Sequence, residues 1–342
     1  MAGIWYKGLN VMKIAFFEIK DWEKEKLEQI FPNDQLYFFQ EPLSKGNVEK
    51  AKDCEAISVF IYSKINKDIL NKLVDLKMIA TRSTGFDHID TVCCKQKGIV
   101  VCNVPFYGEN TVAEHTFALI LALSRNVHKS YFRGLRGDFN IEGLKGFDLK
   151  ERTIGVVGAG NIGLHVIRIA KGFGMKVLAF DVKQNKFLAE VLGFEYTSLE
   201  NLLQNSDIIS LHVPANPDTF HLINKNNIEI IKKGAILINT SRGSVVETDA
   251  LIMALDKGIL AGAGLDVLEG EELIKEEKQL LHEKQNPEVL GQILKDHIIL
   301  QKDNVVYTPH IAFYSQEALE RILETTVKNI NGFEENLLQN TV

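Results

Sequence analysis

The chain has 342 residues, of which 45% are hydrophobic and 25% charged, with a formal net charge of −6 at pH 7. This length permits two domains, and the composition is ordinary for a globular protein. The negative charge gives no basic footprint for nucleic acid and argues mildly against anionic membrane surfaces. The longest apolar run, 117–123, is too short to cross a bilayer, and no secretory signal is recognisable. We therefore predict a cytoplasmic protein that binds neither nucleic acid nor membrane.

The cysteines and histidines indicate reduced thiols and no metal site. Four cysteines lie in the first third of the chain, at Cys54, Cys93, Cys94 and Cys102. Adjacent cysteines do not have the spacing of metal ligands, and no Cys-X-X-Cys pair occurs. The nine histidines form no cluster typical of a metal centre. We expect free cysteines, as in a cytosolic enzyme, and no bound metal.

Residues 12–105 are predicted to form a small parallel α/β unit. Apolar runs predict strands at 13–17, 56–61, 78–82 and 99–103, with a helix at 67–76. Strands that alternate with helices in this way are typical of parallel sheets. The first eleven residues are unlike the rest and are treated as an extension.

A long apolar helix is predicted next, from residue 108 to about 129. Thr111 and Glu114 resemble a capping box at its start. Apolar side chains occupy nearly every face of its middle, so the helix must be buried on more than one side. Either a crossover between domains or a homodimer contact through residues 110–129 would provide that burial.

A dinucleotide-binding fingerprint lies in the middle of the chain. A short apolar strand, 153–157, precedes the Gly-X-Gly-X-X-Gly pattern of residues 158–163, and a helical stretch follows. Gly158 allows a tight turn, Gly160 lets the backbone approach a pyrophosphate, and Gly163 lets the helix pack on the strand. The helix N-terminus then faces the phosphate charge. This context favours nucleotide binding over a structural glycine turn.

An acidic residue, Asp181, ends the next predicted strand, 176–181. A carboxylate at this place can accept hydrogen bonds from the adenosine ribose hydroxyls, and it repels a 2′-phosphate. No arginine follows directly, because the next residues are Val182 and Lys183. These residues favour NAD over NADP. The alternative is a solvated aspartate at a strand end.

Further strands predict a doubly wound parallel sheet. They are expected at 208–212, 235–239, 262–266 and 305–307, each short and apolar on both faces. Ligands of such a sheet bind at the carboxyl ends of its strands. A charged and helical insert, 270–303, interrupts the alternation. A last amphipathic helix at 317–333 is expected to pack back on the first unit.

Reactive side chains follow three of these strands. They are Arg242 after one, Asp266, Glu269 and Glu271 after the next, and His310 after the last. Hydride exchange between NAD and a hydroxyl carbon needs three groups. One moves the alcohol proton, a carboxylate holds that first group in place, and a cation binds the substrate carboxylate. Taken singly, Arg242 would be explained as a surface arginine and His310 as a structural histidine. Their recurrence at consecutive strand ends favours catalysis.

Together these motifs resemble the D-specific 2-hydroxyacid dehydrogenases, from residue 12 to the C-terminal helix. The resemblance rests on five motifs in the same order, at residues 84–90, 158–163, 241–243, 266–271 and 308–310. Within the family, residues 107–115 and 266–271 are most similar to D-lactate dehydrogenases. The resemblance implies an α/β protein in which a Rossmann-type, doubly wound NAD-binding domain, 108–311, is inserted into a smaller domain. That flavodoxin-like substrate domain would comprise residues 1–107 and 312–342.

The resemblance implies three catalytic residues. Arg242 would anchor the substrate, His310 would be the acid/base, and Glu271 would orient His310. Glu269 does not match the family's orienting acid. Glu271 argues against a formate dehydrogenase, in which a glutamine takes its place.

The resemblance also implies binding residues for the cofactor and the substrate. Asp266 matches a residue that holds the nicotinamide carboxamide. The other implied cofactor contacts are Gly158, Gly160, Asn161, Ile162, Gly163, Asp181, Val213, Pro214, Thr219, Thr240 and Ser241. Main-chain N–H groups around Thr84 and Gly85 match the loop that binds the substrate carboxylate, and Tyr107 matches a tyrosine that lines the pocket.

We therefore predict an NAD-dependent enzyme that reduces pyruvate to D-lactate. The insert before His310 is longer than in many family members, which leaves glyoxylate, hydroxypyruvate or another 2-keto acid as alternatives. A protein of another class is also compatible with the fold, because fold alone does not determine function. Corepressors that resemble this family bind NAD as a conformational signal and do not act as enzymes.

Overall fold

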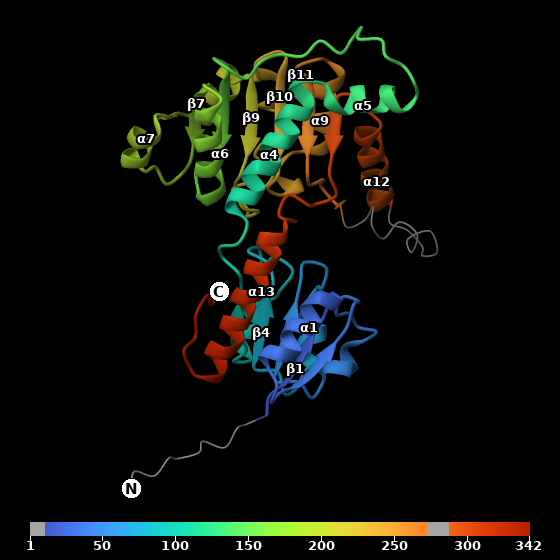
Figure 1. The fold of residues 1–342 in the computed structure, drawn as a ribbon, viewed down its shortest axis with the longest axis vertical. Coiled ribbons are helices and arrows are strands. Elements are labelled where there is room, and N and C mark those ends of the chain that lie inside the picture. Colours follow the sequence, from blue (N-terminus) through green and yellow to red (C-terminus); the bar gives the residue numbers. More distant parts are fainter. Residues whose placement is uncertain (1–10, 272–286) are drawn as a thin grey trace. The chain divides into compact units, whose positions relative to one another are not determined.

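The structure is a computed structural model that describes residues 11–271 and 287–342. The chain divides into two compact units (Figure 1). The first comprises the chain up to Tyr107 together with Ser315–Val342, and the second is Gly108–Tyr314. The predicted return of the chain to the first unit is at residue 312. Residues 312–314 instead group with the second unit, where the main-chain N–H of Ala312 donates to Asp266.

The first unit is built on a parallel sheet with the strand order β2-β1-β3-β4-β5. Its elements are β1 (Lys13–Phe16), α1 (Asp21–Ile30), β2 (Gln35–Phe38), η1 (Val48–Ala51), β3 (Ala56–Val59), α2 (Lys67–Lys72), β4 (Met78–Thr81), α3 (Thr91–Gln96), β5 (Val100–Cys102) and α13 (Gln316–Glu334). This strand order is the flavodoxin-like one. Alternate strand residues face two cores. Ile14 and Met78 pack with α1 and α13, whereas Ala15 and Ile57 pack with α2 and α3.

The second unit is built on a seven-stranded parallel sheet with the order β12-β11-β10-β9-β6-β7-β8. Its elements are α4 (Glu109–Ser124), α5 (Val127–Leu135), β6 (Thr153–Val157), α6 (Asn161–Gly172), β7 (Lys176–Phe180), α7 (Lys186–Leu192), β8 (Glu195–Tyr196), α8 (Leu199–Asn205), β9 (Ile208–Leu211), η2 (Ile228–Ile230), β10 (Ala235–Asn239), η3 (Gly243–Val245), α9 (Thr248–Asp256), β11 (Leu260–Leu265), α12 (Pro287–Leu300) and β12 (Val305–Tyr307). The strand order reverses between β6 and β9, where doubly wound sheets bind their ligands. The two parallel sheets confirm the predicted α/β class.

Helices cover both faces of this second sheet. Ile208 and Ile236 pack with α4 and α6, whereas their neighbours Ile209 and Leu237 pack with α8 and α9 on the other face. Burial on both faces explains why these strands are continuous apolar runs in the sequence.

The single helix predicted at 108–129 is wrong, because the chain turns at Asn126. α4 ends at Ser124, Asn126 has a φ of +50°, and α5 then begins. The predicted capping box is also wrong. The N-cap of α4 is Gly108, and Glu114 accepts a hydrogen bond from Asn110 instead. α4 is buried within its own unit, between the sheet and α6, so its apolar character needs no second subunit.

Part of the predicted insert 270–303 is helical, as expected. α12 covers Pro287–Leu300 and packs beside α9. Residues 272–286 lie outside the described part of the chain. Among the described helices, none is long and apolar enough to cross a membrane.

Candidate active site

Three adjacent strands carry the predicted catalytic residues. Arg242 follows β10, Glu271 follows β11 and His310 follows β12. β11 pairs in parallel with both β10 and β12, so all three strands end at the same edge of the sheet. The fingerprint after β6 and Asp181 after β7 belong to this edge too. The second unit thus combines the predicted cofactor and catalytic residues.

His310 and Glu271 form a close pair. Nδ1 of His310 lies 2.5 Å from Oε1 of Glu271, and both side chains are mostly buried. A carboxylate is only an acceptor, so Nδ1 carries a proton and the ring is oriented by Glu271. Proton exchange with a ligand then falls to the other ring nitrogen, Nε2.

The loop of His310 is built around one buried carboxylate. Asp266 accepts hydrogen bonds from the Thr308 hydroxyl at 2.5 Å and from the main-chain N–H groups of Ile311 and Ala312 at 3.0 and 2.9 Å. His310 itself has a φ of +55°, an uncommon conformation that these bonds hold. The structure therefore shows Asp266 as the organiser of this loop. Its contact with the nicotinamide stays a prediction.

His115 of α4 joins the same cluster. Its Nε2 lies 2.9 Å from the Thr308 hydroxyl and 3.5 Å from Oδ1 of Asp266. Burial lowers the pKa of His115, and the charge of Asp266 partly opposes that shift. Neither His115 nor Thr308 was predicted to have a role, although both lie inside motifs of the resemblance, 107–115 and 308–310.

The loop of Arg242 is fixed by the last residue of β10. The side-chain oxygen of Asn239 accepts from the main-chain N–H and the hydroxyl of Ser241, at 3.0 and 2.8 Å. Its amide group donates to the carbonyl of Arg242 at 2.9 Å. Thr240 shares a hydrogen bond of 3.0 Å with Thr116 of α4. The guanidinium donates to the carbonyl of Ser241 at 2.8 Å. The main chain that carries Arg242 is thus fixed by hydrogen bonds, and the role of Arg242 as a carboxylate anchor stays a prediction.

The fingerprint has the space that a dinucleotide needs. Gly158 has a φ of +94°, and a Cβ there would lie 2.7 Å from the carbonyl oxygen of His212. A Cβ on Gly163 would lie 2.0 Å from the carbonyl oxygen of Gly158. At Gly160, the N-cap of α6, a Cβ would meet only open space. Tight packing at two glycines and space at the third fit a pyrophosphate at the start of α6.

The remaining predicted cofactor residues lie at the same strand ends. Asp181 is held by the main-chain N–H groups of Ala159 and Lys183, each at 2.8 Å, so its carboxylate is fixed beside the fingerprint. Asn161 and Ile162 begin α6. Val213, Pro214 and Thr219 lie in the loop after β9, where the Thr219 hydroxyl donates to the Pro214 carbonyl at 2.5 Å.

The predicted substrate residues Thr84, Gly85 and Tyr107 belong to the first unit. The loop after β4 is held by side chains. The Thr84 hydroxyl donates to the Val104 carbonyl at 2.9 Å, and Asn103 donates to the Thr84 carbonyl at 2.8 Å. Their contact with a substrate stays a prediction.

The structure assigns the cysteines no part in this site. All four are buried and free, and burial raises the pKa of Cys54, Cys94 and Cys102 to about 11. Within residues 11–271 and 287–342, no group of three or more His, Cys, Asp or Glu side chains is placed to hold a metal ion.

Known proteins share this arrangement over nearly the whole chain. The family model for the NAD binding domain of D-isomer specific 2-hydroxyacid dehydrogenases matches residues 117–312. A crystal structure of D-lactate dehydrogenase from Aquifex aeolicus, complexed with NAD and lactic acid, has a TM-score of 0.88 and 40% identity, covering 96% of this chain and 98% of that one. D-lactate dehydrogenase of Escherichia coli K12 is 36% identical over 331 residues, 94% of this chain and 97% of the relative. Glyoxylate reductase of Korarchaeum cryptofilum is 35% identical over 320 residues, 92% and 90% of the two chains.

The matched region contains the fingerprint, Arg242, Glu271 and His310 on one sheet edge. The chain therefore belongs to the D-isomer specific 2-hydroxyacid dehydrogenases and is an NAD-dependent oxidoreductase of that family.

Proposed function

We propose that the enzyme reduces pyruvate to D-lactate with NADH. The observation that carries the proposal is the 2.5 Å contact between His310 and Glu271, one strand away from the Arg242 loop. A small 2-keto acid as substrate is supported by the relatives with D-lactate dehydrogenase activity and by the lactic acid in one of them.

The side chains have separate tasks in this reaction. Bound NADH supplies the hydride, which adds to the carbonyl carbon of the keto acid. Protonated His310 gives a proton from Nε2 to the carbonyl oxygen, and Glu271 stabilises the charge of the ring before transfer. Arg242 binds the substrate carboxylate with two parallel hydrogen bonds and polarises the carbonyl. One hydride and one proton are thus added, which balances pyruvate against D-lactate.

The alternative substrates are glyoxylate, hydroxypyruvate and bulkier 2-keto acids. A glyoxylate reductase is as similar to this chain as a D-lactate dehydrogenase is, so identity does not separate them. Each methylene in an apolar pocket changes the preference by only about 1–3 kcal/mol. The relative kcat/KM values for pyruvate, glyoxylate, hydroxypyruvate and 2-ketoisocaproate, with NADH and with NADPH, decide between them. We expect pyruvate with NADH to be preferred. No oxidation of NADH with pyruvate, together with turnover of another of these acids, would refute pyruvate as the substrate.

A substitution of the acid/base tests the mechanism. We expect His310→Asn to lower kcat by about 10²–10⁴-fold, because proton transfer to the carbonyl oxygen is lost. Stopped-flow measurement of NADH oxidation checks this. NADH affinity by fluorescence titration and the unfolding midpoint should stay close to wild type. Near-normal turnover of His310→Asn would refute the assignment.

We also propose that the enzyme is a homodimer. The predicted contact helix, residues 110–129, is revised, because its first part is core. α5 instead has no buried residue and exposes Val127, Tyr131, Phe132 and Leu135. A second copy of the chain that covers this helix would remove the apolar side chains from water. The cytoplasmic location stays a prediction.

A further inference from the structure

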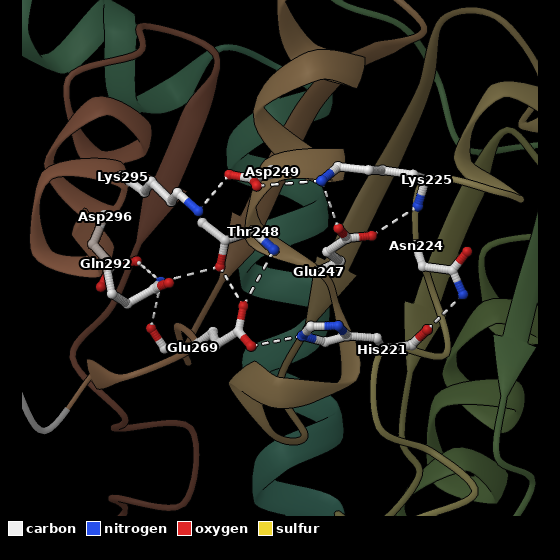
Figure 2. Close-up of polar contacts among 10 residues, drawn as sticks. All are labelled: His221, Asn224, Lys225, Glu247, Thr248, Asp249, Glu269, Gln292, Lys295 and Asp296. Atoms are coloured by element: carbon white, nitrogen blue, oxygen red, sulfur yellow. Dashed lines mark hydrogen bonds and ion pairs between the residues drawn. The ribbon is translucent and has the colours of Figure 1, made fainter. Parts of the chain in front are cut away.

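We propose that the hydrogen-bonded pair of His221 and Glu269 positions the catalytic residues. Gln292 of α12 supports this pair through a hydrogen bond to Glu269. The three side chains lie together in Figure 2. They act on the main chain that carries Glu271 and take no part in proton or hydride transfer. The inference rests on the proposed acid/base role of His310 with Glu271.

His221 connects two loops of the active-site edge. Its Nε2 lies 2.6 Å from Oε1 of Glu269, and its ring stacks on Phe220 with 3.9 Å between centroids. Because a carboxylate only accepts, Nε2 of His221 carries the proton. The main-chain N–H of His221 donates to the carbonyl of Ser244 at 2.8 Å, two residues after Arg242. His221 therefore joins the segment after Arg242 to the loop before Glu271.

Glu269 is held from two further helices. Its Oε2 accepts from the Thr248 hydroxyl at 2.6 Å and from the Thr248 N–H at 3.3 Å, at the start of α9. Its main-chain carbonyl accepts from Nε2 of Gln292 at 2.9 Å, and Gln292 also bonds Thr248 and the buried Asp296. As Figure 2 shows, both α9 and α12 thereby converge on Glu269.

The pair lies close enough to move both catalytic loops. A Cβ on Gly243 would lie 2.1 Å from the carbonyl of Leu268 and 2.4 Å from the nitrogen of Glu269, so the two loops touch main chain to main chain. Glu271 follows Glu269 by two residues across a turn, in which its N–H donates to Leu268 at 3.2 Å. A shift of Glu269 therefore displaces Glu271 relative to His310 and loosens the support of Arg242.

Two features without a role in the sequence analysis are explained in this way. Glu269 does not match the family's orienting acid, yet it is the centre of the network. The charged insert ends in α12, whose Gln292 reaches the loop of Glu271. A misplacement of about 1 Å in an active site can cost roughly 100-fold in rate. The insert is then part of the scaffold of the catalytic pair.

Four variants and one control test the proposal. His221→Asn tolerates the φ of +48° at this position but has too short a side chain to reach Glu269. Glu269→Ala and the double variant test whether the two act as one unit. His221→Gln restores a donor of longer reach. Lys225→Met is the control, because Lys225 bonds Glu247 and Asp249 in the same region at 2.9 and 3.3 Å (Figure 2).

We expect His221→Asn and Glu269→Ala to lower kcat for pyruvate reduction by about 10- to 100-fold, with little change in NADH affinity. The double variant should be no worse than either single one. His221→Gln should recover part of the loss, and Lys225→Met should be like wild type. Equal kcat in wild type and His221→Asn would overturn the proposal, and so would an equal loss in Lys225→Met.

A spectroscopic measurement separates this inference from the proposed function. The proton between Nδ1 of His310 and Glu271 should give a downfield ¹H signal in ¹⁵N-histidine-labelled protein, and Glu271→Gln should abolish it. We expect His221→Asn to shift or broaden that signal. If the wild type reduces no 2-keto acid, the proposed function fails, and this signal still decides the positioning role. An unchanged signal in His221→Asn rules the role out.

Discussion

At the scale of single residues, one buried carboxylate holds the loop of His310, the proposed acid/base. Asp266 accepts three hydrogen bonds from the loop of His310 and is 1% exposed. Both carboxylate oxygens of Asp266 accept hydrogen bonds, so in Asp266→Asn the amide N–H₂ would replace one of these acceptors. At least one buried donor of the His310 loop would then lose its partner. We expect a loss of about 1–3 kcal/mol in the free energy of unfolding and a lower kcat, measured by urea titration and NADH oxidation.

Asp207→Asn is the matched control for this substitution. Asp207 also accepts a main-chain hydrogen bond, from Thr153, but it precedes β9 and lies at the opposite edge of the sheet. We expect Asp207→Asn to lower the free energy of unfolding and to leave kcat unchanged. If Asp266→Asn lowered the free energy of unfolding but left kcat unchanged, Asp266 would not organise the loop of His310.

We expect His212 to make the stability of the protein depend on pH. Burial lowers the pKa of His212 to about 3, and its Nε2 is 2.8 Å from the Ser210 hydroxyl. The unfolded chain takes up this proton near pH 6.5, whereas the native state takes it up only near pH 3. The unfolded state then binds more protons, so the free energy of unfolding falls as pH drops through this window, by at most about 1.4 kcal/mol per unit.

Substitution of His212 isolates this contribution from that of the carboxylates. We expect His212→Gln to have a shallower fall in the free energy of unfolding between pH 7 and pH 4 than wild type, with pH 8 as the reference for each. Chemical unfolding followed by far-UV circular dichroism measures it. Parallel curves for the two proteins would contradict the prediction.

At the scale of elements, the sequence predicted buried strands best. β6 and β10 have the predicted bounds, because strands buried on both faces are continuous apolar runs. β12 has the predicted bounds too, although it is a half-buried edge strand, because its three residues are all apolar. The edge strands β2 and β8 were not predicted, since they are short and partly exposed and have no such run. The end of α4 was missed because apolar residues continue into α5, and only the positive φ of Asn126 separates the two.

For the site too, local sequence patterns predict the residues at strand ends but not the contacts that hold them. Arg242, Glu271 and His310 could be predicted, because each follows a strand end within a short motif. The contacts that hold them join residues far apart in the chain. Glu269 and His221 are separated by 48 positions, and Asp266 and Ala312 by 46. No local pattern encodes such pairs, so only the folded sheet edge reveals them.

At the scale of the whole molecule, the exposed apolar side chains of α5 and the segment after it point to self-association. Arg133 donates to the carbonyls of Asn140 and Glu142 at 3.0 and 2.7 Å and so ties that segment to α5. We call the resulting group the α5 patch, and its members are Val127, Tyr131, Phe132, Leu135, Phe139 and Ile141.

A substitution within the α5 patch tests the dimer without touching the core. Phe132 and Leu135 are 58% and 67% exposed, so Phe132→Ser/Leu135→Ser leaves the fold intact. Burying each such side chain contributes about 1.5–3 kcal/mol, so the double substitution should raise the dimer Kd by roughly 100-fold or more. Sedimentation equilibrium measures the change, and Phe187→Ser on α7, at a residue 72% exposed, is the matched control. A wild-type monomer at micromolar concentration excludes the dimer, whereas a variant as dimeric as the control places its interface away from α5.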